Sequence, residues 1–102
     1  MDNWSVYLVR CRDGSLYAGI ATDVERRVAE HQANRGAKYL RGRGPLKLVF
    51  EKQVGSRSQA LKIEHKVKGL TRLEKEDLIS AHPEIIRAIF GWKPINGSGN
   101  ET

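Results

Sequence analysis

The sequence has one cysteine, no long apolar run and few acidic residues in its middle part. Cys11 alone cannot form an internal disulfide, and a single thiol does not make a zinc site. No apolar run reaches membrane length and the N-terminus lacks a signal-peptide pattern, so we expect a cytoplasmic protein that does not enter a membrane.

The basic residues are concentrated in the middle of the chain. The formal net charge is +6, and from Arg26 to Arg72 there are 13 Lys/Arg residues against three acids. Such a distribution favours a polyanionic partner, most often nucleic acid, although a solvated basic surface without a partner would look the same. The length of 102 residues and the 39% hydrophobic content predict one soluble domain over residues 1–93. Residues 94–102 have the composition of a disordered tail.

Residues 4–20 have the pattern of a β-hairpin. Apolar and polar residues alternate on both sides of Asp13-Gly14, a strong turn signal. A two-residue loop would place Tyr7 and Tyr17 on opposite faces of the sheet. A three-residue loop, Arg12 to Gly14, would place them on one face as diagonal neighbours, and we prefer it because Gly14 then occupies the left-handed position. Ordinary sheet packing is the alternative explanation of the two tyrosines.

Capping boxes predict where three helices begin. Thr22 to Glu25 predicts a helix over about 23–33, Ser56 to Gln59 one over 57–68, and Thr71 to Glu74 one to about residue 81. Pro83 and Gly91 bound a last helix over 83–90. Alternating residues predict a third strand from about Leu46 to Val54.

Two polar residues of the first helix lie on its apolar side. Relative to the stripe of Val24 and Val28, His31 and Arg27 are on the same side, one turn apart. Arg27 could simply extend its guanidinium to water, and His31 could be a hydrogen-bonded histidine at the edge of the core. Their shared face makes a joint polar role worth testing.

The loop over residues 34–45 combines cations with an aromatic ring. Flexible cations around an aromatic side chain suit a phosphate backbone and a stacked base. The candidate nucleic-acid-binding residues are Arg35, Lys38, Tyr39, Arg41 and Arg43.

Glu64 lies within the apolar stripe of the second helix. A carboxylate on a core-facing stripe needs an ionic partner, a proton or a metal ion. An internal salt bridge, with Arg27 as one possible partner, is the alternative to metal binding.

Taken in order, the segments VYLV, YAG, DVERRVAEH and ALKIEHKVK resemble the GIY-YIG nuclease superfamily, and most of all its small stand-alone bacterial members. The resemblance covers Trp4 to Ile79. It implies an α+β fold with a small three-stranded antiparallel sheet flanked by helices. The sequence departs from the family pattern in three places. The first motif reads Ser5-Val6-Tyr7, the second reads Tyr17-Ala18-Gly19, and no asparagine follows Glu64 before Asn96.

The resemblance also implies the residues of the site. Tyr7 and Tyr17 match the motif tyrosines, and Gly19 matches the glycine that closes the second motif. Arg27 and His31 match the helix arginine and the residue one turn later. Glu64 matches the glutamate that holds one divalent cation, Mg²⁺ or another such as Mn²⁺.

The function implied is hydrolysis of a DNA phosphodiester bond, in repair or recombination, with selectivity for DNA structure rather than sequence. In this reading Tyr7 takes the proton from water, or His31 relays it, and Tyr17 orients the water or the phosphate. Two alternatives stay open. The chain could bind nucleic acid without cutting it, or it could be a nuclease module that a partner protein targets.

Overall fold

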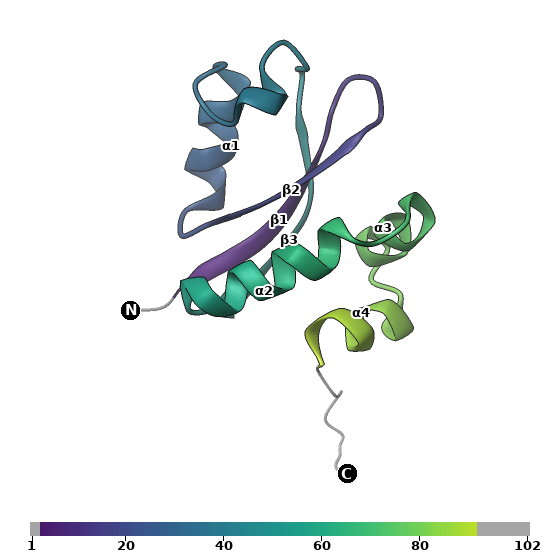
Figure 1. Cartoon of the computed structure of the whole chain (residues 1–102). Coiled ribbons are helices and arrows are strands. Elements are labelled where there is room, and N and C mark those ends of the chain that lie inside the picture. The colour runs from purple at the N-terminus through teal and green to yellow at the C-terminus, as the bar shows by residue number, and fades with distance from the viewer. Residues whose placement is uncertain (1–2, 92–102) are drawn as a thin grey trace. The chain divides into compact units, whose positions relative to one another are not determined.

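The computed structural model describes residues 3–91, which form an α+β fold of three strands and four α-helices (Figure 1). The elements are β1 (Trp4–Arg10), β2 (Leu16–Ala21), α1 (Val24–Gln32), β3 (Lys47–Gly55), α2 (Arg57–Lys68), α3 (Arg72–Ile79) and α4 (Pro83–Phe90), with a short 3-10 turn, Lys38–Leu40, before β3. None of the helices in this described part is long and apolar enough to cross a membrane. The predicted tail, 94–102, lies outside the described residues.

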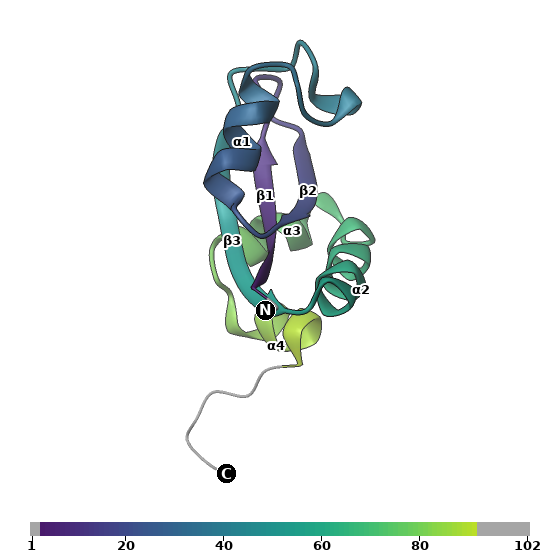
Figure 2. The ribbon, with the colours of Figure 1, turned by 90° about the vertical axis from the view of Figure 1, so that its left-hand side faces the viewer.

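The three strands form an antiparallel sheet with β1 in the centre (Figure 2). Val9 pairs with Tyr17 and Tyr7 pairs with Gly19, which is the register of a three-residue loop. The Cys11 N–H donates to the Ser15 carbonyl at 2.8 Å and closes that loop, while Gly14 takes a φ of 90°. The predicted hairpin register is therefore confirmed, and the two tyrosines lie on the same face of the sheet.

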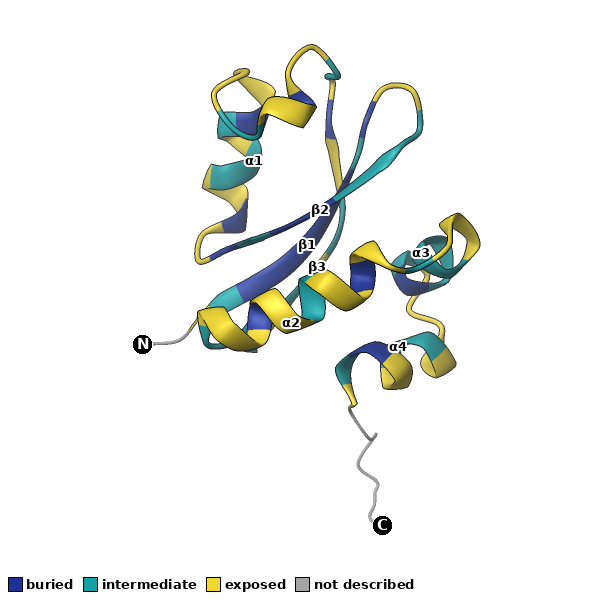
Figure 3. Cartoon of the chain, viewed as in Figure 1, coloured by how far each residue is buried: buried dark blue, intermediate teal, exposed yellow. Residues whose placement is uncertain are grey.

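One compact unit, Met1–Lys68, contains the sheet, α1 and α2. Alternate residues of β1 pack with the apolar side of α1 and with the loop before β3. This cluster contains Tyr7, Val9, Cys11, Ala21, Val24, Leu40 and Leu46. Val6 and Leu8 point to the other face and are also fully buried, so both faces of β1 are covered (Figure 3). The helix α2 packs along the sheet, chiefly against β2, and contributes buried Ala60 and Val67.

The second unit, Gly69–Thr102, contains the helix pair α3 and α4 in its described part. The predicted capping box at Thr71 and Glu74 is formed, with hydrogen bonds of 3.1 and 2.9 Å. Pro83 lies in the first turn of α4, and Gly91 ends that helix with a φ of 60°. The predictions for both helices are confirmed within a residue or two at each end.

The start of α1 differs from the prediction. Asp23, rather than Thr22, is the N-cap, because its carboxylate accepts the Arg26 N–H at 3.0 Å. Two adjacent residues of cap-forming type precede the helix, and the acid three positions after Thr22 favoured the wrong one. The cap of α2 is as predicted, since Ser56 and Gln59 exchange hydrogen bonds of 2.8 and 3.1 Å.

Replacing Asp23 with alanine should lower the free energy of unfolding by about 1 kcal/mol, because a helix N–H loses its acceptor. Thr22→Ala is the matched control and should change stability by only a few tenths as much, since Thr22 does not cap the helix. Urea unfolding followed by circular dichroism measures both. Equal losses in the two variants would contradict the assignment of the cap.

Candidate active site

Tyr7 is the centre of the polar cluster on the α1 face of the sheet. It comes from the middle of β1, and only 1% of the residue is exposed. Its ring lies against Gly19 of the neighbouring strand, and its phenolic oxygen meets His31 of α1. A Cβ at position 19 would lie 2.6 Å from the Tyr7 Cζ and would meet the phenolic oxygen as well. Gly19 is therefore a packing requirement of the tyrosine above it.

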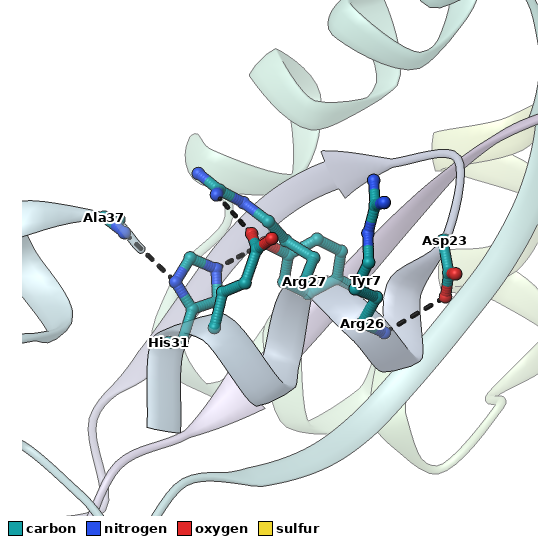
Figure 4. A network of polar contacts seen from close by, with 7 residues as sticks. Tyr7, Asp23, Arg26, Arg27, His31 and Ala37 are labelled. Carbon is teal, nitrogen blue, oxygen red and sulfur yellow. Dashed lines mark hydrogen bonds and ion pairs between the residues drawn. The ribbon is translucent and has the colours of Figure 1, made fainter. Parts of the chain in front are cut away.

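His31 binds Tyr7 from α1. Its Nε2 lies 2.8 Å from the Tyr7 Oη, and only 2% of the residue is exposed (Figure 4). Its Nδ1 accepts a hydrogen bond of 3.1 Å from the Ala37 N–H. Because Nδ1 is an acceptor, the neutral imidazole must carry its proton on Nε2 and donate it to the Tyr7 oxygen.

Gly36 makes room for the imidazole. A Cβ at this position would lie 2.7 Å from the His31 Cε1 and would also meet Nδ1. The sequence predicts neither this contact nor the hydrogen bond from the Ala37 amide. A glycine five residues after a helical histidine is a weak sequence signal of such a contact. A hydrogen bond from a main-chain amide has no sequence signal, because every residue except proline carries that N–H.

Arg27 extends from α1 between the cluster and solvent. Its Nη1 donates to the Glu30 carboxylate at 2.9 Å, and its side chain is 41% exposed. A hydrogen bond to Glu30 is the main reason that the pKa of Arg27 is raised. Burial raises the pKa of Tyr7, and the charge of the Arg27 guanidinium opposes that rise. The Arg27 side chain is thus held by Glu30, and its charge acts on the phenolic oxygen of Tyr7.

Burial is the largest cause of the pKa shifts of both Tyr7 and His31. Burial and the nearby Tyr17 together raise the pKa of Tyr7 to about 12, against the opposing effect of Arg27. Burial, then the charge of Arg27, holds the pKa of His31 below its ordinary value. At neutral pH the cluster therefore contains a neutral phenol, a neutral imidazole and a charged guanidinium.

Glu64 faces this cluster from α2. Its charge is close enough to raise the pKa of Tyr7, and its side chain is only 17% exposed. Its ion pair is with Lys68 at 3.6 Å, whereas Arg27 pairs with Glu30. The salt bridge between Glu64 and Arg27, considered from the sequence, is therefore not formed, because each charge has a partner on its own helix.

The carboxylate of Glu64 fits a hard divalent cation. Among the described residues no group of three or more His, Cys, Asp or Glu side chains could hold a metal ion. Mg²⁺ does not require such a group, because it is commonly bound by one or two carboxylates with waters and substrate phosphates. The single, largely buried carboxylate of Glu64, with one long ion pair, matches that donor set.

The loop after α1 stacks on the second tyrosine. Tyr39 lies parallel to Tyr17, with ring centres 5.8 Å apart and planes 19° apart. The Arg43 guanidinium lies 4.3 Å from the centre of the Tyr39 ring and pairs with Asp13 at 3.3 Å. Tyr17 in turn meets His31 edge-on at 5.8 Å. A continuous row of rings therefore leads from the exposed loop to the buried cluster.

The other basic residues of the loop are exposed. They are Arg35, Lys38 and Arg41. Arg41 and Arg43 line a pocket of about 320 Å³ together with Arg12 and Asp13. The structure thus brings together Tyr7, Tyr17, Arg27, His31 and Glu64 in one cluster and places the predicted nucleic-acid-binding residues on the loop beside it.

The small α+β domain brings two tyrosines, an arginine, a histidine and a glutamate together at one sheet. This combination of fold and side chains is typical of a nuclease domain. The model of the GIY-YIG catalytic domain matches residues 3–77, and the chain belongs to this family. The resemblance seen in the sequence is therefore confirmed. Nucleases of this family generally use divalent metal ions.

The relatives are small bacterial proteins. A UPF0213 protein of Yersinia pestis is 51% identical over 87 residues, covering 85% of this chain and 92% of the relative. One of Cronobacter sakazakii is 54% identical over 80 residues, covering 78% and 84%. The solution NMR structure of a UPF0213 protein from Bacillus halodurans is 45% identical, with a TM-score of 0.52 over 81% of this chain and 90% of that one. The solution NMR structure of a protein from E. faecalis is 37% identical, with a TM-score of 0.54 over 79% of this chain and 90% of that one.

Nitrogen-15 NMR of the imidazoles should show His31 protonated on Nε2 and unprotonated on Nδ1, because the Ala37 amide occupies Nδ1. The unfolded chain takes up a proton at the ordinary histidine pKa of 6.5, whereas folded His31 resists it to lower pH. The unfolded state therefore binds more protons below pH 6.5, and the free energy of unfolding should fall as the pH decreases from there.

The His31→Gln variant should lack this acid-dependent loss, and His65→Gln, on the exposed side of α2, should retain it. Urea unfolding at a series of pH values measures the difference. An Nδ1-protonated tautomer, or the same pH dependence in the two variants, would contradict the hydrogen-bond assignment.

Proposed function

We propose that this protein is a metal-dependent endonuclease that hydrolyses a DNA phosphodiester bond with Tyr7 as the general base. The observation that carries the proposal is the phenolic oxygen of Tyr7, which has His31 as a hydrogen-bond partner at 2.8 Å and lies within electrostatic reach of both Arg27 and Glu64. A donor from His31 and the nearby positive charge of Arg27 stabilise the phenolate anion, and the anion is the form able to accept a proton from water.

The tautomer of His31 supports Tyr7 rather than His31 as the proton acceptor. A relay through His31 needs a free lone pair on Nε2, and the proton would then be on Nδ1, facing the Ala37 N–H. Two N–H groups would point at each other. His31 is therefore a donor that positions and stabilises the Tyr7 anion.

The proposed reaction begins with the ionised Tyr7. Water gives a proton to the phenolate oxygen and its own oxygen attacks phosphorus, opposite the bond to the 3′ oxygen. That bond breaks, which leaves a 5′-phosphate, and the 3′ oxygen takes a proton from solvent. Arg27, half exposed and tied to Glu30, holds the non-bridging oxygens with its remaining donors, and Tyr17 orients the water or the phosphate.

Glu64 would hold the divalent cation, Mg²⁺ or Mn²⁺. The bound ion would supply positive charge to the phosphate and leaving oxygen and make the Tyr7 anion easier to form. Glu64 suits this role because Lys68, its ion-pair partner, is itself exposed and can be released to solvent.

The loop over residues 34–45 would bind the DNA backbone on the side of Tyr17. Arg35, Lys38, Arg41 and Arg43 supply charge, and Tyr39 supplies an exposed ring that stacks on Tyr17. The described residues, 3–91, form no separate domain for reading a base sequence, so selectivity for DNA structure is more reasonable than selectivity for sequence. We extend the proposal to a cytoplasmic role in repair or recombination, with or without a targeting partner.

Glu64→Gln should reduce Mg²⁺-dependent cleavage of branched and linear DNA at least about 100-fold, because the loss of a charged group at a reacting centre typically costs that much. Binding to the same DNA in EDTA should remain. Glu25→Gln, on the exposed side of α1, changes the net charge equally and should cleave like wild type. Unchanged cleavage by Glu64→Gln would contradict the assignment. A salt-sensitive complex without any product from wild type would instead support the non-catalytic binder.

The cleavage rate should rise with pH through the neutral and mildly alkaline range. Below a pKa near 12 the fraction of Tyr7 in its anionic form increases about tenfold per pH unit, and the rate follows that fraction. Tyr7→Phe should abolish both the activity and this slope, whereas Tyr17→Phe should reduce the rate and retain the slope. Single-turnover rates from pH 6 to 9 provide the test. A slope that persists in Tyr7→Phe would assign the base to another group.

A further inference from the structure

A second pocket adjoins the cluster on the far side of Arg27. Its volume is about 340 Å³, and it lies between the end of β2, the first turns of α1 and the start of α2. The residues that matter here are Trp4, Ile20, Arg26, Arg27 and Arg57. All of them belong to the unit Met1–Lys68, so their relative placement is that of a single folded body.

The carboxylates that line the pocket do not neutralise all of its positive charge. Asp23 is occupied as the cap of α1, where it accepts the Arg26 N–H, and Glu30 pairs with Arg27. The guanidinium of Arg57 lies 5.6 Å from the centre of the Trp4 ring and, within residues 3–91, joins no ion pair. Arg57 is exposed, so it can turn to an anion at little cost.

Trp4 and Ile20 give the same pocket an apolar wall. Trp4 is half-buried at the start of β1, and its indole ring presents a face to the cation above it. An indole face beside guanidinium groups suits the flat base and the charged phosphate of a nucleotide, since aromatic rings stack on bases irrespective of sequence. A purely anionic ligand would gain nothing from the tryptophan, and an apolar ligand would gain nothing from the arginines.

Arg27 connects this pocket to the reacting centre. The same guanidinium lines the pocket and acts on the Tyr7 oxygen. On α2, Arg57 precedes Glu64 by seven residues, a separation of about 10 Å along the helix axis. A stacked strand advances about 3.4 Å per nucleotide, so this separation corresponds to about three nucleotides at most.

We propose that this pocket binds a nucleotide of the strand that is cut, one to three positions from the scissile phosphate. Arg57 and Arg26 hold its phosphate, and Trp4 packs against its base. The proposal rests on the proposed nuclease function for the direction of the strand, but the pocket itself needs only nucleic-acid binding. Basic residues at positions 34–45 would hold the strand on the other side of the cluster, so the strand would cross Tyr7 between two cationic sites.

Binding without catalysis is the first test. In EDTA, with a fluorescein-labelled oligonucleotide, single-stranded or duplex, Arg57→Ala should weaken binding about tenfold and lower the salt slope by about one. Lys62→Ala removes one exposed cation from the same helix outside the pocket and should have a smaller effect. Equal losses in the two variants would overturn the proposal, because Arg57 would then act only through net charge.

Trp4 provides an independent signal. The chain has two tryptophans, so a Trp92→Phe variant leaves Trp4 as the single emitter. Addition of an unlabelled oligonucleotide should quench its fluorescence, and Arg57→Ala should shift the titration to higher concentration. Binding without a change in Trp4 emission would overturn the contact with the base.

Single methylphosphonate groups, placed one at a time around the cleavage site, locate the phosphate. At one position, one to three nucleotides from the cut, the modification should weaken binding to wild type but not to Arg57→Ala. Additive losses at every position would overturn the placement. These outcomes are separate from those of Glu64→Gln. If Glu64→Gln loses cleavage but Arg57→Ala binds the oligonucleotide like wild type, the nucleotide pocket alone is rejected. If Arg57→Ala weakens binding but the wild-type protein cleaves no DNA, the nuclease function alone is rejected.

Discussion

The hydrogen bond between His31 and Tyr7 is the interaction on which the rest of the site depends. It joins α1 to the central strand, and both partners are almost fully buried, so an unpaired polar atom there would be costly. Its geometry requires a glycine beneath the tyrosine ring and a second glycine beside the imidazole. The three-residue hairpin loop, the start of α1 and the path of the chain after α1 all serve this contact.

Electrostatics divide the cluster into a neutral interior and a charged rim. Tyr7 and His31 are held neutral by burial, while Arg27 and Glu64 keep their charges at the boundary with solvent, each with a partner on its own helix. Those surface partners contribute little to stability. They orient long side chains before any ligand arrives, which reduces the ordering that a nucleic acid would have to impose.

Most of the framework was predictable from local patterns. Alternation and the position of Gly14 predicted the hairpin and its register, and periodicity placed Arg27, His31 and Glu64 on inward-leaning helix faces. The start of α1 was placed one residue early because Thr22 and Asp23 are both good caps. The partners were not predictable, since a carboxylate on one helix can pair either within that helix or across the sheet, and Glu64 pairs with Lys68. The proximity of Trp4 and Arg57 to Arg27 was also not predictable from the sequence, because the three residues lie on separate elements.

The group that selects the tautomer of His31 belongs to the main chain. The donor is the main-chain N–H of Ala37, so the hydrogen bond itself does not depend on the side chain at this position, although that side chain packs against the core; proline, which lacks the N–H, would remove the donor. What is inherited at this point is the course of the main chain, and it would be visible only by superposition of structures.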